Sequence, residues 1–388
     1  MRMNKIVLSV ALVTASIATQ AVDLPDQASD RAKEVAAVKA FWTADRIKNA
    51  QPRDFVVDER GLAYIKGKGG KLTPYGHSRS ATPTPMAKGG KGGGGGGGTD
   101  TGGGGKGGKG GGGGDTGGTG GFADVKNAAW PNGGVVQTAA GRIFFVMGGS
   151  GYVCSGTLVD DGETQSDRSI ILTAAHCVYD DVNKAFAEAA IFIPNQAETT
   201  GAGTDADCAN DPNGCWAADF GVVSNGWRAS VFPNNIPSDY AFYALGTNGV
   251  AAYFANDGRD VAMDSVITPM EISFGDATLN TYTRALGYSY SDDPNFMYCG
   301  EPVTGSSYGG LLLPNCGLSG GSSGGPWSQS QAADLGTGPL ISVNSYGPSR
   351  GKPYMGGPKL SGNDAACLFD VAKSAPAGNT TGIVGGGC

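Results

Sequence analysis

Short apolar or alternating segments run through residues 122–388, separated by turns rich in Gly, Asn, Asp and Ser. They include Gly141–Met147, Tyr152–Val159, Ser169–Ala174, Ala190–Pro194, Asp239–Leu245, Tyr282–Gly287 and Leu340–Ser345. Many short strands between turn signals are typical of a β-sandwich or a pair of barrels, so this pattern predicts an all-β fold. Residues 183–190 are the one plausible short helix here, and Leu368–Cys388, interrupted by Pro376 and several Gly, gives little sign of one.

Residues 22–88 follow a different pattern. Apolar residues recur at helical spacing between Asp30 and Asn49, which predicts a helix. A strand is expected over 54–65, whereas the Gly, Pro, Ser and Thr of residues 69–85 predict little order. Residues 89–121 contain 24 Gly among 33 residues, a composition that cannot bury a core, so we expect a flexible linker. The fold is therefore predicted to be preceded by a partly disordered N-terminal region.

Residues 1–21 have the layout of a cleavable secretory signal. Arg2 and Lys5 precede an uncharged apolar run, and small residues precede a cut after Ala21. The run over residues 6–17 is too short for a stable bilayer-spanning helix, and no other stretch of about 18 apolar residues exists. We therefore expect a secreted protein, extracellular or periplasmic, with no membrane contact after removal of the signal.

Charge divides the chain into two parts. Residues 1–121 carry 17 Lys and Arg against 10 Asp and Glu, a formal charge of +7, which leaves −14 for residues 122–388. An acidic globular part argues against a nucleic-acid partner, because binding phosphates requires a positive surface. The opposite charges motivate the hypothesis that residues 22–88 are a pro-segment, which covers the acidic part until the chain is cut in the linker.

Three segments carry residues suited to nucleophilic catalysis: residues 172–177 read LTAAHC, residues 238–245 read SDYAFYAL and residues 320–326 read GGSSGGP. A serine hydroxyl needs an adjacent base, and histidine accepts and returns a proton near neutral pH. His77 and His176 are the only histidines, and His77 precedes the linker, so a histidine base of the globular part must be His176. The same count excludes a metal site built on several histidines, and no C-x-x-C pair exists. We expect no metal and no cofactor.

In this order, LTAAHC at 172–177, CSGTLV at 154–159, GSSGGP at 321–326 and SYG at 345–347 resemble the trypsin/chymotrypsin family of serine endopeptidases, in particular its bacterial secreted members. The resemblance covers roughly residues 141–347. It implies that residues 122–388 form a protease domain of two antiparallel six-stranded β-barrels, the first over about 122–248 and the second over about 249–388.

The resemblance also implies residue roles. His176 matches the general base and Ser323 the nucleophile, and the backbone N–H groups of Gly321 and Ser323 match the oxyanion hole. Asp239 matches the carboxylate that orients the histidine, because it precedes alternating apolar residues between the other two. Asp219 is the competitor for this role, and we prefer Asp239.

Substrate recognition is implied in the same way. Ser345, Tyr346 and Gly347 match the strand that pairs with the substrate backbone and walls the primary specificity pocket. Gly317, six residues before Ser323, stands at the position that sets charge preference in trypsins, and it carries no acid to select Arg or Lys. A small or apolar side chain is therefore expected at the cleaved bond. Ser322 replaces the Asp that pairs with a freed N-terminus in digestive members, so activation by that ion pair is not expected.

All eight Cys lie between residues 154 and 388, and an even count confined to one region indicates disulfides formed in an oxidising compartment. The resemblance implies a bridge between Cys154 and Cys177. Proximity suggests Cys208–Cys215 and Cys299–Cys316, which leaves Cys367–Cys388.

The sequence as a whole predicts a secreted, monomeric serine endopeptidase that hydrolyses proteins or peptides through an acyl-enzyme intermediate. The alternative is a non-catalytic secreted binding protein on the same scaffold, since such scaffolds can lose catalysis and persist. All three positions of the triad are filled, which favours the enzyme.

Overall fold

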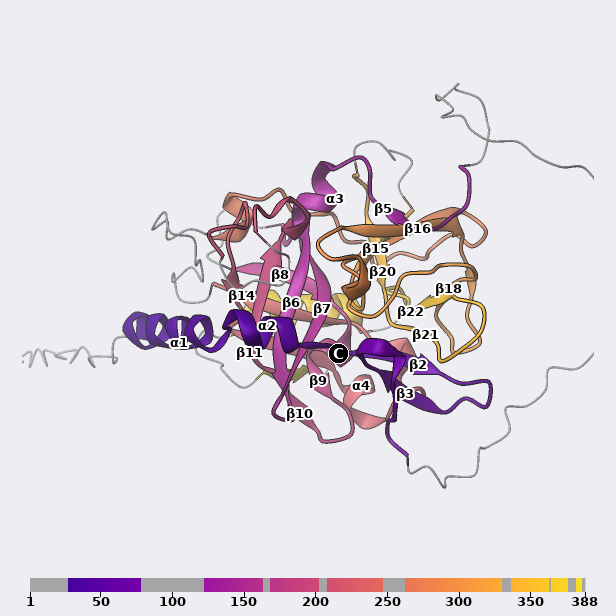
Figure 1. Cartoon of the computed structure of the whole chain (residues 1–388), viewed down its shortest axis with the longest axis horizontal. Helices are drawn as coiled ribbons and strands as arrows, with labels where there is room; N and C mark the ends of the chain where they lie inside the picture. The colour runs from indigo at the N-terminus through magenta and orange to yellow at the C-terminus, as the bar shows by residue number, and fades with distance from the viewer. Residues whose placement is uncertain are drawn as a thin grey trace, which may run out of the picture.

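The computed structural model of the chain (Figure 1) describes residues 27–77, 122–162, 168–201, 208–246, 262–329, 336–362, 364–375, 382–385 and 388. The predicted secretory signal and the predicted Gly-rich linker lie outside these residues. Within the described part of the chain, no helix combines the length and the apolar character needed to cross a bilayer.

The sequence predicted an all-β fold, and the structure is mostly β: strands dominate, but five α-helices occur among the described residues. The largest sheet has nine strands in the order β12-β11-β6-β7-β8-β14-β13-β23, with β1 paired to β7. These strands are β1 (Gln51–Pro52), β6 (Ala140–Met147), β7 (Ser150–Val159), β8 (Ser169–Thr173), β11 (Glu188–Pro194), β12 (Trp216–Ala217), β13 (Phe220–Ser224), β14 (Ala241–Leu245) and β23 (Ile383–Gly385). β6, β8 and β14 are almost wholly buried, which explains their continuous apolar runs.

The later strands form two further sheets. A five-stranded sheet has the order β20-β19-β15-β16-β5, and a seven-stranded sheet has the order β17-β18-β22-β21-β2-β3-β4. The five strands are β5 (Val125–Ala129), β15 (Tyr282–Gly287), β16 (Met297–Pro302), β19 (Pro326–Ser328) and β20 (Leu340–Val343). The seven are β2 (Asp54–Val57), β3 (Ala63–Lys66), β4 (Leu72–Pro74), β17 (Thr304–Gly305), β18 (Leu311–Leu313), β21 (Tyr346–Pro348) and β22 (Met355–Gly357). β5 comes from the residues assigned to the first barrel, but it pairs with β16 of the later strands.

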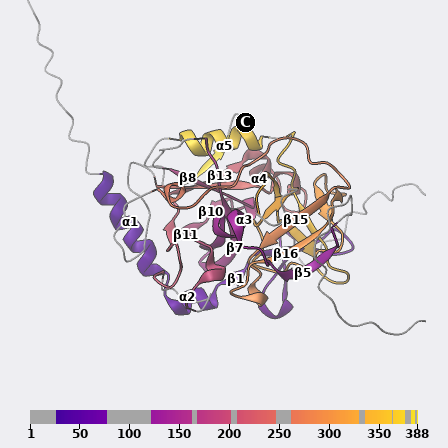
Figure 2. The same ribbon diagram turned by 90° about the horizontal axis from the view of Figure 1, so that it is seen from above.

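Five α-helices occur among the described residues: α1 (Gln27–Phe41), α2 (Ala44–Asn49), α3 (Gly134–Ala139), α4 (Asn225–Ala229) and α5 (Ala365–Ser374). The single helix expected over 30–49 is divided into α1 and α2. Thr43 lies between them and caps the N-terminus of α2, since its side chain accepts the Arg46 N–H at 3.4 Å. The short helix expected over 183–190 is wrong: this stretch forms β10 (Ala185–Phe186), which pairs with β9 (Tyr179–Asp180), and the start of β11. α5, of which residues 368–388 gave little sign, packs on β13 and β14, on the opposite side of the molecule from α2 (Figure 2).

The N-terminal segment, residues 27–77, crosses one face of the molecule. Figure 1 shows it in indigo, running from α1 and α2 beside the strands of the nine-stranded sheet to β2 and β3 beside the later strands. α2 is fixed by Trp42, whose indole Nε1 donates to the Ala189 carbonyl at 2.6 Å and whose ring lies 5.7 Å from that of Phe144. Phe55 and Tyr75 of the segment belong to the main hydrophobic cluster of the molecule. The segment is therefore packed into the fold.

Four disulfides join Cys154 to Cys177, Cys208 to Cys215, Cys299 to Cys316 and Cys367 to Cys388. The first links β7 to the turn that carries His176, and the last ties α5 to the C-terminal residue. Disulfides of this kind typically add roughly 2–4 kcal/mol each by restricting the unfolded chain.

Candidate active site

His176 lies in a tight 3-10 turn, Ala175–Cys177, directly after β8. The Cys154–Cys177 bridge fixes this turn to β7, and the histidine side chain is fully buried. A buried imidazole needs hydrogen-bond partners on its nitrogens, so the groups around it decide what it can do.

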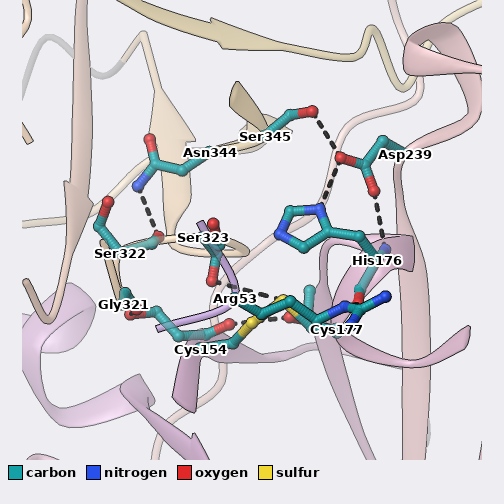
Figure 3. The surroundings of a disulfide bond; sticks show 12 residues. Arg53, Cys154, His176, Cys177, Asp239, Gly321, Ser322, Ser323, Asn344 and Ser345 are labelled. Carbon is teal, nitrogen blue, oxygen red and sulfur yellow. Dashed lines mark hydrogen bonds and ion pairs between the residues drawn. A yellow bond between two sulfur atoms is a disulfide. The ribbon is translucent and has the colours of Figure 1, made fainter. Parts of the chain in front are cut away.

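Asp239 provides the partner on one side of the ring (Figure 3). It lies between the 3-10 turn Ile236–Ser238 and β14, and it is fully buried. One carboxylate oxygen accepts the backbone N–H of His176 at 2.9 Å, and the other is 2.8 Å from the ring Nδ1. The hydroxyl of Ser345 donates to the second oxygen at 2.5 Å. A carboxylate on Nδ1 places the ring proton there and leaves Nε2 as the basic nitrogen.

Asp219, the competing acid, is held elsewhere. Its backbone N–H donates to the Ala244 carbonyl at 2.9 Å, at the edge of β13. Asp239 is thus the carboxylate that the structure brings to His176.

Ser323 lies in the turn that precedes β19, and Figure 3 shows it facing the second nitrogen of the His176 ring. That nitrogen, Nε2, is buried and has no hydrogen-bond partner among the described residues. The Ser323 carbonyl accepts the Ser155 N–H at 2.7 Å, which holds the turn against β7. Hydrogen bonds between catalytic groups are often long in resting structures and shorten when substrate binds.

The turn around Ser323 presents two free backbone donors. The N–H groups of Ser322, Gly324 and Gly325 donate to carbonyls at 3.1, 2.7 and 2.9 Å. Those of Gly321 and Ser323 donate to no acceptor in the part of the chain that is described. Two unpaired backbone donors in one turn, beside a hydroxyl, are suited to binding a developing negative charge.

Glycine is required at two places in this turn. Gly321 has φ +97°, and a Cβ there would lie 2.9 Å from the Tyr288 carbonyl oxygen. Gly324 has φ +82°, and a Cβ there would lie 2.1 Å from Oγ1 of Thr173. Both positions combine a left-handed backbone with close contact, so larger residues would displace the turn that holds Ser323.

Asn344 supports the same turn and gave no signal in the sequence. Its side-chain amide donates to the carbonyls of Leu286 at 2.7 Å and Ser322 at 2.9 Å, and its oxygen accepts the Trp327 indole N–H at 2.8 Å. It is fully buried and directly precedes the SYG motif. Its position beside that motif is the only sequence feature that could have drawn attention to it.

The residues expected to bind substrate lie on and directly before β21 and in the loop that follows β18. Tyr346 and Gly347 form most of β21, whereas Ser345 points to Asp239. The Tyr346 ring lies over Gly356, where a Cβ would come within 2.2 Å of it. Gly317 donates its N–H to the Lys126 carbonyl at 2.6 Å, which ties it to β5.

The N-terminal segment contributes residues that the sequence did not link to the site. The Arg53 side chain donates through Nε to the His176 carbonyl at 2.7 Å. The Phe55 ring is stacked on the His176 imidazole, with 4.5 Å between the ring centres and 19° between their planes. Desolvation raises the pKa of the Asp54 carboxyl to about 6, although Lys66 and His176 act in the opposite direction.

The only cluster of potential metal ligands found among the described residues is Cys154, His176 and Cys177. Both sulfurs are joined in a disulfide, so neither offers a thiolate to an ion.

A known family model matches part of the chain. Residues 126–219 match the family model described as lysyl endopeptidase, C-terminal domain, a range that includes His176 but ends before Asp239 and Ser323. No curated protein matches the chain.

Solved structures similar to the chain include three proteases. The protease Anisep from Arthrobacter nicotinovorans is 25% identical with a TM-score of 0.49, covering 64% of this chain and 100% of that chain. The thermostable serine protease AL20 from an extremophilic microorganism is 26% identical with a TM-score of 0.49, covering 62% and 99%. A Glu endopeptidase is 18% identical with a TM-score of 0.47, covering 65% and 99%. With the family match added to the sequence motifs and the site geometry, we conclude that the chain has the trypsin-like serine protease fold.

Proposed function

We propose that the chain is a secreted serine endopeptidase that hydrolyses peptide bonds through an acyl-enzyme intermediate. The observation that carries this proposal is the fully buried Asp239–His176 pair, whose free Nε2 faces Ser323 beside the two unpaired N–H groups. We also interpret the two groups of strands as the two β-barrels of this fold, with the site between them.

In the first half of the reaction, His176 Nε2 takes the proton from the Ser323 hydroxyl while Oγ bonds to the substrate carbonyl carbon. The carbonyl oxygen becomes an oxyanion, which the N–H groups of Gly321 and Ser323 bind. The imidazolium that forms is stabilised by Asp239 through Nδ1. The C–N bond then breaks, and the Nε2 proton passes to the leaving amine, which leaves the acyl group on Ser323.

In the second half, water takes the place of the amine. His176 accepts a proton from water while the water oxygen bonds to the acyl carbon. The bond between that carbon and Ser323 Oγ then breaks, and His176 returns the proton to Oγ. The buried carboxylate serves both halves equally, because it holds one imidazole tautomer and one ring orientation.

Two kinds of side chain are candidates for the substrate residue before the cleaved bond. Gly317 carries no acidic side chain, which supports cleavage after small or apolar residues. The family model that matches is described as lysyl endopeptidase, which makes lysine the competing choice. Cleavage of a peptide library that varies this one residue distinguishes them: enrichment of lysine would overturn the expectation of a small or apolar side chain.

Labelling with a fluorophosphonate probe tests the reaction. Modification should occur at Ser323, and its rate should fall by ~100- to 10,000-fold in His176→Ala because proton transfer is lost. His77→Ala is the matched control, since it removes the only other histidine of the sequence and should label no more slowly. Mass spectrometry of the labelled peptide identifies the modified residue.

Two results would contradict the proposal. Equal labelling rates of the wild-type and His176→Ala chains would show that His176 does not act as the base for the Ser323 hydroxyl. No labelling of Ser323 under any condition, including variants that open the site, would favour the non-catalytic binding protein.

A further inference from the structure

The N-terminal segment adds a strand to the strand expected to bind substrate. β2 pairs in parallel with β21, with Phe55 opposite Tyr346, Val56 opposite Gly347 and Val57 opposite Pro348. On its other side β2 pairs with β3, and β3 with β4. Because backbone groups on one edge of a strand can serve one partner at a time, β21 cannot pair along this edge with another peptide while β2 is bound.

Phe55 covers the histidine itself. Its ring is fully buried between His176, Phe232 and Tyr75, with ring centres 4.5, 4.5 and 4.7 Å away. Trp227 lies 6.4 Å away and completes this aromatic pocket. One face of the imidazole is therefore occupied by a side chain from the segment, which explains why His176 is fully buried.

Two buried polar side chains anchor the segment next to this pocket. Arg53 donates to the His176 carbonyl and lies 3.6 Å from Asp180, and it donates to the Tyr75 hydroxyl at 3.2 Å. The Tyr75 hydroxyl donates in turn to Asp181. Arg53 is 2% exposed. Charge-assisted hydrogen bonds at buried sites are among the strongest that a docked segment can form.

The segment passes across the catalytic residues. β1 pairs in parallel with β7 at Tyr152 and Val153, on one side of the site, and β2 pairs with β21 on the other. Where the two strands meet, Pro52 at the end of β1 and Asp54 at the start of β2 lie against Gly320, where an added Cβ would be 2.9 and 3.1 Å from their Cβ atoms. Gly320 belongs to the same turn as Ser323. The chain thus runs from one wall of the site to the other over the reacting groups.

The bound segment is not held as a substrate. A peptide bond in position for attack would place its carbonyl oxygen on the N–H groups of Gly321 and Ser323. Within the described residues those two groups have no acceptor, although Pro52 and Asp54 lie beside Gly320. The segment therefore fills the site without offering a bond to Ser323.

We propose that residues 51–77 are an internal inhibitor, which occupies the substrate-binding strand β21 and covers His176 with Phe55, so that the full chain is latent until this segment leaves. The proposal rests on the proposed peptidase function and names its regulation.

When the segment leaves, the carboxylates of Asp180 and Asp181 keep hydrogen-bond donors from residues outside the segment. Asp181 still accepts the Phe232 N–H at 2.7 Å and the Asn235 side-chain amide at 2.8 Å. Asp180 keeps the Val182 and Asn183 N–H groups at 3.0 and 2.9 Å. Although burial opposes it, hydrogen bonds from Asn183, together with the charge of Arg53, lower the pKa of Asp180. Both acids thus retain partners of their own domain, which makes dissociation compatible with a folded site.

Phe55→Ala in the full chain is the direct test. If opening of the segment limits access to Ser323, removal of the central aromatic anchor should raise the rate of fluorophosphonate labelling at least ~10-fold. Leu72→Ala is the matched control, because it also truncates a large apolar side chain of the segment, on the outer strand β4. Its labelling rate should stay near that of the wild type.

Two further measurements keep the test decisive. Arg53→Met preserves the apolar stem but removes the hydrogen bond to His176, so it should speed labelling without emptying the aromatic pocket. Hydrogen exchange at residues 55–57 reports docking without any catalysis: these amides should be protected in the wild type and less protected in Phe55→Ala.

The outcomes are distinguishable. Wild-type labelling as fast as that of Phe55→Ala, or unprotected amides at residues 55–57 in the wild type, would overturn the internal inhibitor. Protected amides in the wild type that open in Phe55→Ala, with no labelling of either protein, would uphold the docked segment and overturn the peptidase function. If Phe55→Ala and Arg53→Met are labelled fast and the wild type is labelled slowly, the internal inhibitor and the peptidase function are both supported.

Discussion

Asp239 is a fully buried carboxylate with three hydrogen bonds, from the His176 N–H, the His176 ring and the Ser345 hydroxyl. A buried charge is tolerated only when its acceptor sites are filled, and these partners fill them. Because two of the three come from one residue, the carboxylate fixes both the backbone and the ring of His176. The orientation of Nε2 toward Ser323 follows from these contacts.

Asn344 supports the Ser323 turn through its side-chain amide, and Asn344→Asp tests this support. The substitution keeps the acceptor for Trp327 but removes both donors, so the buried carbonyls of Leu286 and Ser322 lose their partners. We expect the free energy of unfolding to fall by at least ~2 kcal/mol, measured by thermal or denaturant unfolding. Displacement of the turn should slow Ser323 labelling at least ~10-fold.

Asn127→Asp is the control for Asn344→Asp, since it makes the same chemical change at an exposed position on β5. Its stability and labelling should match the wild type. Equal stability and labelling rate for the two variants would show that Asn344 does not support the turn.

At this scale the sequence pointed to His176 and Ser323 because dense local motifs surround them. Asp239 was preferred over Asp219 on a loose pattern, since an acid before apolar residues is common in β proteins. The sequence could not assign Asn344, Arg53 or Phe55 to the site. Their partners lie far away in sequence, and neither a hydrogen bond to a distant carbonyl nor a contact with a distant ring leaves a local pattern.

β21 is the element that links fold and regulation. Without β2 its outer edge would present unpaired backbone groups, and such an edge readily accepts another strand. The hairpin β2–β3 covers this edge in the full chain. The same backbone groups that we expect to bind substrate therefore bind the segment first.

Docking of β2 should depend on pH through Asp54. Burial raises its pKa to about 6 in the docked segment against an ordinary value of 3.8, although the facing groups Lys66 of β3 and His176 act to lower it. The docked state binds the proton more tightly, so docking is strongest in acid and weakens as the pH rises from 3.8 to about 6. The full change in docking affinity is up to roughly 100-fold.

The measurement is the protection factor of the amides at residues 55–57, corrected for intrinsic exchange, between pH 4.5 and 7.5. Asp54→Asn mimics the protonated acid. It should therefore remove the part of the pH dependence that comes from Asp54, and it should increase the amide protection at pH 7.5. Asp45→Asn on α2, an exposed position, should leave the wild-type pH dependence intact. An unchanged pH dependence in Asp54→Asn would contradict the role of this carboxyl.

The elements were predicted unevenly, for physical reasons. Buried strands such as β8 and β14 are continuous apolar runs, and the sequence revealed them. α5 was missed because Pro376 and nearby Gly follow it, although its own residues have four buried positions on one face. The helix expected over residues 183–190 gave way to β10 and β11, because pairing with β9 and β6 overrides a weak local preference for helix.

The charge asymmetry of the whole chain corresponds to contacts at the site. The basic N-terminal part contributes Arg53, which meets Asp180 of the acidic part at a buried position, and Phe55 and Tyr75 join the main hydrophobic cluster. Sequence composition predicted attraction between the two parts, but it did not reveal that the contact lies at His176. That placement depends on the pairing of β2 with β21, which no local pattern specifies.

A cut within the predicted linker, residues 89–121, tests the molecule as a whole. A tether holds its two ends at an effective concentration of roughly millimolar, so an uncut chain should remain latent at any dilution. After cleavage at an inserted protease site, docking becomes bimolecular and depends on concentration. The rate of Ser323 labelling per molecule should then rise as the cut protein is diluted, whereas that of the uncut protein should stay constant.

Phe55→Ala in the cut protein should move this rise to a concentration at least ~10-fold higher, because the weaker segment dissociates sooner. Adding back the separated N-terminal piece should slow labelling again, and a piece that carries Phe55→Ala should do so only at higher concentration. If the cut protein is labelled at the same rate at every dilution, the segment either never blocks Ser323 or never leaves it. Hydrogen exchange at residues 55–57 in the diluted sample separates these two cases, since protection persists only if the segment remains docked.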